Sequence, residues 1–215
     1  VPLREGGMTV QLDPTRLPVI TGRLEQIADE MDATLFRSAF NPIIAEARDA
    51  SHGLYHPSTG ETLIQGKNGL PIFVGTMAFA VKHLINHLNQ NHLTIREGDV
   101  YLFNDPYEGG THTCDMALIR PMFSGGELRA FAIAVAHWSE VGGCVAGSIA
   151  PTATEIYQEG LRIPPLKLYD QGVPNETLFR LLEKAVRVPD KVLGDVLSNI
   201  AALSYGEQEY MLSLI

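Results

Sequence analysis

Two long apolar runs joined by a glycine turn lie in the middle of the sequence. Residues 116–123 and 128–136 are almost entirely apolar, and the tetrapeptide Ser-Gly-Gly-Glu at 124–127 separates them. Two glycines between such runs indicate a β-hairpin, because a tight hairpin turn favours residues that accept positive φ. Consecutive apolar positions predict that both faces of the hairpin are buried. The chain is therefore expected to pack other elements against each side of this hairpin.

The other periodic segments supply those elements. Apolar residues recur at three- and four-residue steps in four segments, which we predict to be helices, and three shorter segments are predicted to be strands. The helices are expected at 14–40, 74–88, 177–186 and 190–214, and the strands at 50–55, 62–65 and 99–104. We predict an α+β fold with a mixed sheet that contains the central antiparallel hairpin and is flanked by amphipathic helices.

Composition excludes several classes of protein. The 215 residues are 45% hydrophobic and 19% charged, which suits a globular core and not a disordered chain. The formal net charge of −9 argues against non-specific nucleic-acid binding. No apolar run is long enough to span a membrane. Without a recognisable secretory signal we expect a cytoplasmic protein. Residues 1–7 are expected to be an upstream extension or a cloning remnant, and residues 8–215 one metal-binding region.

Polar residues that can bind a metal gather at the open end of the predicted hairpin. With the two glycines in the turn, counting back along both strands places His137 beside the segment 112–115. His112, Asp115 and His137 can then converge, and two imidazoles with a carboxylate suit a borderline divalent ion. Asp49, at the start of the strand predicted at 50–55, is the best local candidate for a fourth ligand.

The sequence alone also allows simpler interpretations of these residues. A His-x-x-Asp pair often forms only a loop hydrogen bond, and His137 can be an ordinary polar residue at a strand end. Cys114 is expected to be a small buried hydrophobe, although a thiolate ligand would make a structural zinc site. Asp105, which precedes a proline, can serve as a turn-forming residue.

A second polar region follows a glycine-rich loop at residues 142–148. Arg162 and Glu155 are tentative substrate-binding residues, because a guanidinium can grip a carboxylate. The alternative is a structural loop in which Arg162 pairs with Glu155 or Glu159. The sequence has neither a phosphate-binding loop nor a dinucleotide-binding glycine fingerprint, and it lacks a nucleophile elbow. If a nucleotide is used, another chain is expected to bind it.

Several motifs together resemble the hydantoinase B family. They are Asn104-Asp105-Pro106-Tyr107, Gly109-Gly110-Thr111-His112 with Asp115, Ala136-His137 with Val141-Gly142-Gly143, Thr154-Glu155-Ile156, and Gln158 to Pro165. The opening helix with Arg48-Asp49 beyond it agrees, so the resemblance covers residues 12–214 in order. The family includes B-type chains of ATP-dependent N-methylhydantoinases, the C-terminal part of 5-oxoprolinases, and one chain of acetone and acetophenone carboxylases.

The resemblance implies the following for cofactors and partners. An A-type partner would bind ATP and Mg²⁺ and phosphorylate an amide or enolate oxygen of a small-molecule substrate. The B-type chain would hold Zn or Mn through Asp49, His112, Asp115 and His137. Family members are longer, so this chain resembles the N-terminal part of a B-type chain in a hetero-oligomer. Glu140 stands where the family commonly has Asp.

The expected function is therefore the metal-binding part of an ATP-dependent hydrolase that opens a cyclic amide of the hydantoin or oxoproline type. One alternative is a subunit of an ATP-dependent ketone carboxylase, which differs by consuming bicarbonate. Another is a non-catalytic scaffold with a structural metal, which differs by leaving no ligand position open for water.

Overall fold

A computed structural model describes residues 14–213, so the extension expected at 1–7 and residue 214 of the last predicted helix lie outside the described residues. Within this part of the chain, neighbouring strands form one seven-stranded sheet in the order β2-β1-β5-β4-β3-β6-β7, and every pairing is antiparallel. The strands are β1 (Ala50–Tyr55), β2 (Thr62–Gln65), β3 (Val100–Phe103), β4 (Asp115–Ser124), β5 (Glu127–His137), β6 (Leu166–Asp170) and β7 (Val173–Pro174).

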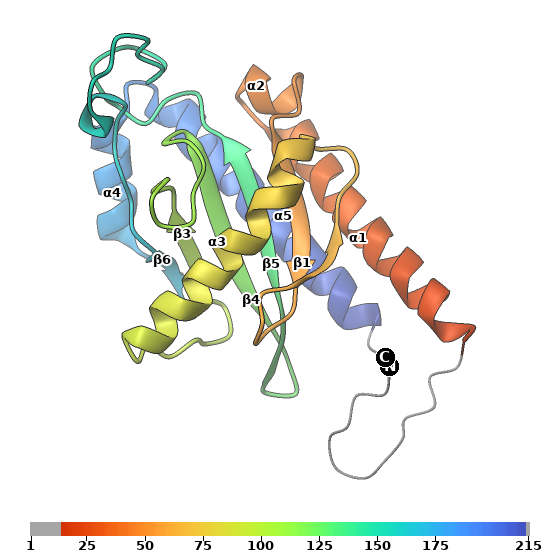
Figure 1. Cartoon of the computed structure of the whole chain (residues 1–215). Coiled ribbons are helices and arrows are strands. Elements are labelled where there is room, and N and C mark those ends of the chain that lie inside the picture. The colour runs from red at the N-terminus through yellow and green to blue at the C-terminus, as the bar shows by residue number, and fades with distance from the viewer. Residues whose placement is uncertain (1–13, 214–215) are drawn as a thin grey trace.

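Helices cover both faces of the sheet and make three layers. The helices are α1 (Arg16–Ser38), α2 (Pro42–Ala45), α3 (Pro71–Gln90), α4 (Glu176–Ala185) and α5 (Pro189–Ser213), with a short 3₁₀ helix at Ile156–Gln158. Helix α3 crosses one face, and α1 and α5 lie together behind the other (Figure 1). The α+β class, the central hairpin and the flanking helices are confirmed. The sheet is antiparallel at every pairing described, where we expected a mixed sheet.

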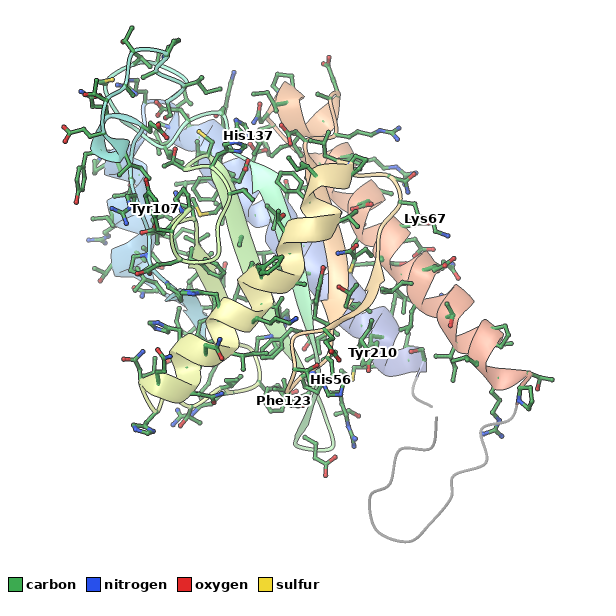
Figure 2. The ribbon with its side chains drawn as sticks, viewed as in Figure 1. His56, Lys67, Tyr107, Phe123, His137 and Tyr210 are labelled. Atoms are coloured by element: carbon green, nitrogen blue, oxygen red, sulfur yellow. The ribbon has the colours of Figure 1, made fainter. Side chains whose placement is uncertain are left out.

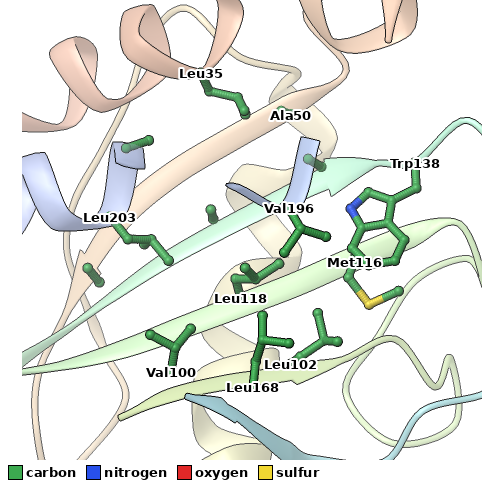
Figure 3. Packing of buried hydrophobic residues seen from close by; sticks show 14 of the residues in the cluster. Leu35, Ala50, Val100, Leu102, Met116, Leu118, Trp138, Leu168, Val196 and Leu203 are labelled. Carbon is green, nitrogen blue, oxygen red and sulfur yellow. The ribbon is translucent and has the colours of Figure 1, made fainter. Parts of the chain in front are cut away.

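The central hairpin is buried on both faces, as predicted, and its two faces differ in size. In β5 the alanines at 130, 132, 134 and 136 belong to the core under α1 and α5, whereas Phe131, Ile133 and Val135 belong to the core under α3. Figure 3 shows the first core, with Leu118 of β4 and Val196 of α5 among its residues. Small residues on one face allow the two-helix layer to approach the sheet closely.

The helix pair α1 and α5 also packs closely. A Cβ added to Gly206 of α5 would come within 2.4 Å of the sulfur of Met31 in α1. A larger residue at this crossing would require the Met31 side chain to move. Among the described residues, no helix is both long enough and apolar enough to cross a bilayer.

Candidate metal centre

Asp115 and His137 face each other at the open end of the hairpin. The turn pairs Ser124 with Glu127, as predicted, and an irregularity between Met122 and Phe123 then shifts the register by one residue. From there to the end of the hairpin the shifted register holds, so Asp115 is the Cα partner of His137. Figure 2 shows His137 at the end of the sheet remote from Phe123.

The Asp115 carboxylate lies between two imidazoles. Its Oδ1 is 2.8 Å from Nδ1 of His137, and its Oδ2 is 2.6 Å from Nδ1 of His112. The hydroxyl of Thr111 and the backbone N–H of His112 also donate to Oδ2. The Asp115 side chain is buried, whereas that of His112 is 70% exposed and marks the open side of the site.

The ionisation of these groups follows from their contacts. Burial raises the pKa of the Asp115 carboxyl, but the hydrogen bonds from His137, Thr111 and His112 outweigh it and leave that pKa below its usual value. Burial lowers the pKa of His137, but the hydrogen bond to Asp115, together with the nearby Cys114 side chain, outweighs it and raises the pKa to about 10. A proton therefore competes with any metal for His137.

Asp49 reaches the same point from the start of β1. Its backbone carbonyl accepts a hydrogen bond of 3.0 Å from the N–H of His137. Burial raises the pKa of its carboxyl, while the charges of His137 and His112 lower it and that of Asp115 raises it. Asp49, His112, Asp115 and His137 all line one pocket. The structure thus brings all four predicted residues together.

The chemistry of the four side chains fits a divalent ion. Ligand atoms at about 2.0–2.2 Å from a tetrahedral ion lie roughly 3.3 Å apart. The Asp115–histidine separations of 2.6 and 2.8 Å are hydrogen-bonded contacts, and an ion held by these groups would require each contact to open by roughly 0.5–0.7 Å. In the described part of the chain, no three His, Cys, Asp or Glu side chains are already arranged as a metal shell. Metal binding therefore requires this small rearrangement.

The pocket beside these residues has a volume of about 430 Å³ and a largely apolar wall. The start of α3 supplies Leu70, Ile72 and Phe73, and the loop after β5 supplies Ile149 and Ala150. Cys114 also lines the pocket, and its buried side chain forms no disulfide. This volume lies within the range of about 300–1,000 Å³ that is usual for small-molecule sites.

Arg187 holds the loop that forms part of this wall. Its Nη1 donates to Oε2 of Glu140 at 2.7 Å and to the carbonyls of Gly142 and Val145, and its Nη2 donates to the carbonyl of Gly143 at 2.6 Å. Glu140 is buried and also accepts from the backbone N–H of Arg187. Sequence reasoning had not singled out Arg187, because nothing in the motif at 142–148 indicates its distant partner.

Arg162 has a different partner from either predicted glutamate. Its Nη2 and Nε donate to Oδ2 of Asp105 at 2.6 and 3.0 Å, so the expected pairing with Glu155 or Glu159 is wrong. The other oxygen of Asp105 accepts from the backbone N–H of Tyr107 and forms the expected turn. Arg162 also lies over the rings of Tyr107 and Tyr157. Because Asp105 already neutralises Arg162, the guanidinium is less available to a substrate carboxylate.

Glu155 lies in an adjoining hollow instead. This hollow has a volume of about 380 Å³, and it shares His112, Thr111 and Glu159 with the apolar pocket. Glu155 therefore stands near the open side of the site, beyond His112. Its substrate-binding role stays a prediction.

A histidine–carboxylate cluster at the end of an antiparallel sheet, next to an apolar pocket, defines a candidate metal-dependent small-molecule site. A sequence model of the hydantoinase B/oxoprolinase family matches residues 13–214, which is nearly the whole chain. The chain belongs to this family.

Several relatives agree with this assignment. An uncharacterised protein of Methanocaldococcus jannaschii is 37% identical over 93% of this chain. The beta chain of the caprolactamase of Pseudomonas jessenii is 35% identical over 92%, and the B chain of a putative D-/L-hydantoinase of Pseudomonas sp. is 32% identical over 94%. The chain spans about one third of the length of these relatives, at 35%, 33% and 34% respectively.

Two solved structures share the fold. The ATP-dependent caprolactamase from Pseudomonas jessenii superposes with a TM-score of 0.85 at 33% identity, covering 95% of this chain and 34% of that one. A nucleotide-free acetone carboxylase superposes with a TM-score of 0.87 at 23% identity, covering 94% and 26%. The second likeness concerns the fold alone.

Proposed function

We propose that this chain is the metal-binding part of a B-type subunit in an ATP-dependent enzyme that hydrolyses a cyclic amide. The observation that carries the proposal is the convergence of His112, Asp115 and His137 with Asp49 on one pocket. Relatives named as chains of a putative hydantoinase and of a caprolactamase support the reaction class. The catalytic role of each of these four residues is also proposed.

The polar and apolar side chains of the pocket would have different roles. Before an ion binds, Asp115 orients both imidazoles, because its two oxygens contact one Nδ1 each. Asp49, His112, Asp115 and His137 would hold a Zn or Mn ion. When bound, such an ion polarises a carbonyl or makes a water molecule more acidic. The apolar wall at Leu70 to Phe73 would hold the substrate ring and exclude bulk water from it.

ATP would be bound with Mg²⁺ by an A-type partner, in keeping with the missing phosphate-binding loop. Two relatives are themselves named as one kind of chain in an enzyme of several chains, which supports a hetero-oligomer. We also propose a cytoplasmic location. Both cysteines are free, which suits a reducing compartment.

Metal content tests the site. Purified wild-type chain, dialysed against Zn²⁺ or Mn²⁺ and analysed by mass spectrometry, is expected to retain about one ion, and His137→Ala to retain none. His92→Asn is the matched control, since His92 is exposed, lies outside the pocket and has a φ of 52°, which Asn tolerates. Equal metal in wild type and His137→Ala would contradict the assignment.

Turnover tests the reaction class. The full-length B-type chain, combined with its A-type partner, is expected to release ADP in response to a cyclic amide without added bicarbonate. A strict need for bicarbonate would favour the ketone carboxylase alternative. Metal retention without any cyclic-amide-dependent ADP release or bicarbonate dependence would favour the scaffold alternative.

A further inference from the structure

We propose that the pocket selects a neutral cyclic amide with a hydrocarbon ring and rejects a cyclic amide that carries a carboxylate. This inference rests on the proposed function and narrows its substrate class. It follows from the charges and the apolar surfaces that line the site.

The apolar wall offers nothing that would bind an anion through a side chain. Leu70, Ile72 and Phe73 come from the start of α3, and Ile149 and Ala150 face the same space from the loop after β5. Phe73 is buried, so it forms a fixed part of the wall, whereas Ile72 and Ile149 are 59% and 69% exposed at its rim. A hydrocarbon ring placed here removes apolar surface from water.

The ionisable side chains of the pocket are acidic apart from the two histidines. Asp49, Asp115 and Glu159 line it, and no Lys or Arg is among the described residues that do so. A divalent ion held by neutral histidines would neutralise two of these three carboxylates and leave one net negative charge. An anionic substrate would therefore meet net repulsion, since like charges brought together in a binding site cost affinity.

Arg162 and Arg187, on the loops around the pocket, are already paired. Arg48 precedes Asp49, but its guanidinium lies over the ring of Phe36 and Arg48 does not line the pocket. Arg162 donates to Asp105 through two nitrogens. Arg187 donates to Glu140 and to three backbone carbonyls. Recruiting either guanidinium for a substrate would leave a largely buried carboxylate without its partner, which is costly. Neither arginine is thus positioned to neutralise a substrate carboxylate.

A matched ligand pair tests the inference. 2-Pyrrolidinone and 5-oxoproline share the same lactam ring and differ only by a carboxylate. Binding to the Zn²⁺-loaded chain can be measured by ligand-observed NMR titration, with ε-caprolactam as a larger neutral ring. We expect both neutral lactams to bind and 5-oxoproline to bind at least about tenfold more weakly.

A positive charge added at the rim should weaken this preference. Ile72→Lys places an ammonium beside the pocket at an exposed position of the first turn of α3, so the fold should tolerate it. Ile72→Gln is the control of similar polarity without charge. Ile72→Lys is expected to raise the ratio of 5-oxoproline affinity to 2-pyrrolidinone affinity severalfold relative to the same ratio in Ile72→Gln.

The outcomes separate the two proposals. If 5-oxoproline binds the wild-type chain as tightly as 2-pyrrolidinone, the charge selection is wrong while a cyclic-amide site remains. If Ile72→Lys leaves the ratio of the two affinities at its Ile72→Gln value, the electrostatic basis is wrong. If no cyclic amide binds the metal-loaded chain, the proposed function of the site fails, and the substrate class fails with it.

Discussion

One residue of β5, Arg129, decides which side chain meets His137. Phe123 pairs with Leu128 and Met122 pairs with Ala130, so Arg129 has no partner on β4. Such a bulge shifts the register of all the strand beyond it. Without it Cys114 would stand opposite His137, as the simple count from the glycine turn had placed it. With it Asp115 takes that position, and its carboxylate contacts the imidazole at 2.8 Å.

Arg187 provides a test of how a single side chain shapes the pocket. Arg187→Met should lower the free energy of unfolding by about 2 kcal/mol, because the buried Glu140 loses its charged partner and keeps only the backbone N–H of residue 187. The Arg187 side chain is 43% exposed, so the loss falls short of that for a fully buried pair. Hydrogen exchange of the amides in residues 142–150 should also speed up, since three carbonyls lose a donor.

Lys184→Met is the control for Arg187→Met. Lys184 pairs with Glu183 on the surface of α4, and both side chains are largely exposed. Such pairs contribute little, so the free energy of unfolding should stay close to that of wild type. Equal losses in the two variants, measured by urea denaturation, would mean that Arg187 does not hold the loop.

A buried carboxylate on α5 predicts a pH effect on stability. Oδ1 of Asp195 accepts from the backbone N–H groups of Phe40 and Asn41, but Oδ2 is buried without a hydrogen-bond partner. Burial raises the pKa of this carboxyl above its ordinary value of 3.8. Its charge therefore destabilises the fold at neutral pH, and the penalty disappears as the pH falls through the raised pKa toward 3.8.

Asp195→Asn should isolate this effect. The amide keeps an acceptor for the same backbone groups and removes the charge, although its NH₂ group takes the unpartnered position of Oδ2. The stability of the variant relative to wild type should therefore be greatest at pH 7. This relative stability should decrease steadily toward pH 4. A difference in unfolding free energy that stays constant between pH 7 and pH 4 would show that the carboxylate charge is not the cause.

At the level of elements, the two glycines of the hairpin turn can be tested separately. Gly125 and Gly126 have φ values of 62° and 81°, and a Cβ added to either would touch nothing within 4 Å. Any cost of substitution is therefore conformational. Gly126→Ala should destabilise the fold by about 1 kcal/mol, whereas Gly125→Asn should cost much less, since Asn accepts this conformation. Thermal unfolding would contradict this if both variants matched wild type.

Elements with a strong apolar pattern were predictable from sequence, and elements that depend on a neighbour were not. Strands β1 and β2 have the predicted bounds, and α4 differs by one residue at each end. Strands β6 and β7 were missed, because residues 166–170 include Lys167 and Asp170, show no continuous apolar run, and hydrogen-bond to β3. Helix α2 was missed because Asn41-Pro42 was interpreted as the stop of the helix predicted at 14–40, whereas it caps and begins α2.

The same distinction applies to the site. Its convergence was predictable, because antiparallel strands joined by a two-residue turn must bring His137 near Asp115. The pairing of Arg162 with Asp105 was not, since the two residues are 57 positions apart in the sequence and no periodic pattern connects them. The apolar wall from Ile72 and Phe73 was also missed, because nothing in the sequence indicates that α3 begins beside the hairpin end.

Across the whole molecule, the candidate metal ligands connect segments that lie far apart in sequence. Asp49 precedes β1, His112 and Asp115 lie at the start of β4, and His137 ends β5. The order β1-β5-β4 places these three strands side by side at the centre of the sheet. An ion bound by all four residues would cross-link three adjacent strands at one end, so metal binding should stabilise the fold as a unit.

This linkage predicts a metal-dependent unfolding temperature. At a free metal concentration of about 100 times its Kd, Zn²⁺ or Mn²⁺ should add about 2.7 kcal/mol to the free energy of unfolding. For a chain of 215 residues this corresponds to a rise of roughly 5–10 °C in Tm. Asp115→Asn should lose most of this rise, because Asp115 contacts both histidines, and His92→Asn should retain it, because His92 lies outside the pocket. Calorimetry with each metal and with EDTA measures the shift, and acidification should abolish it as protons displace the ion from the histidines. An equal shift in Asp115→Asn and wild type would place the ion elsewhere in the molecule.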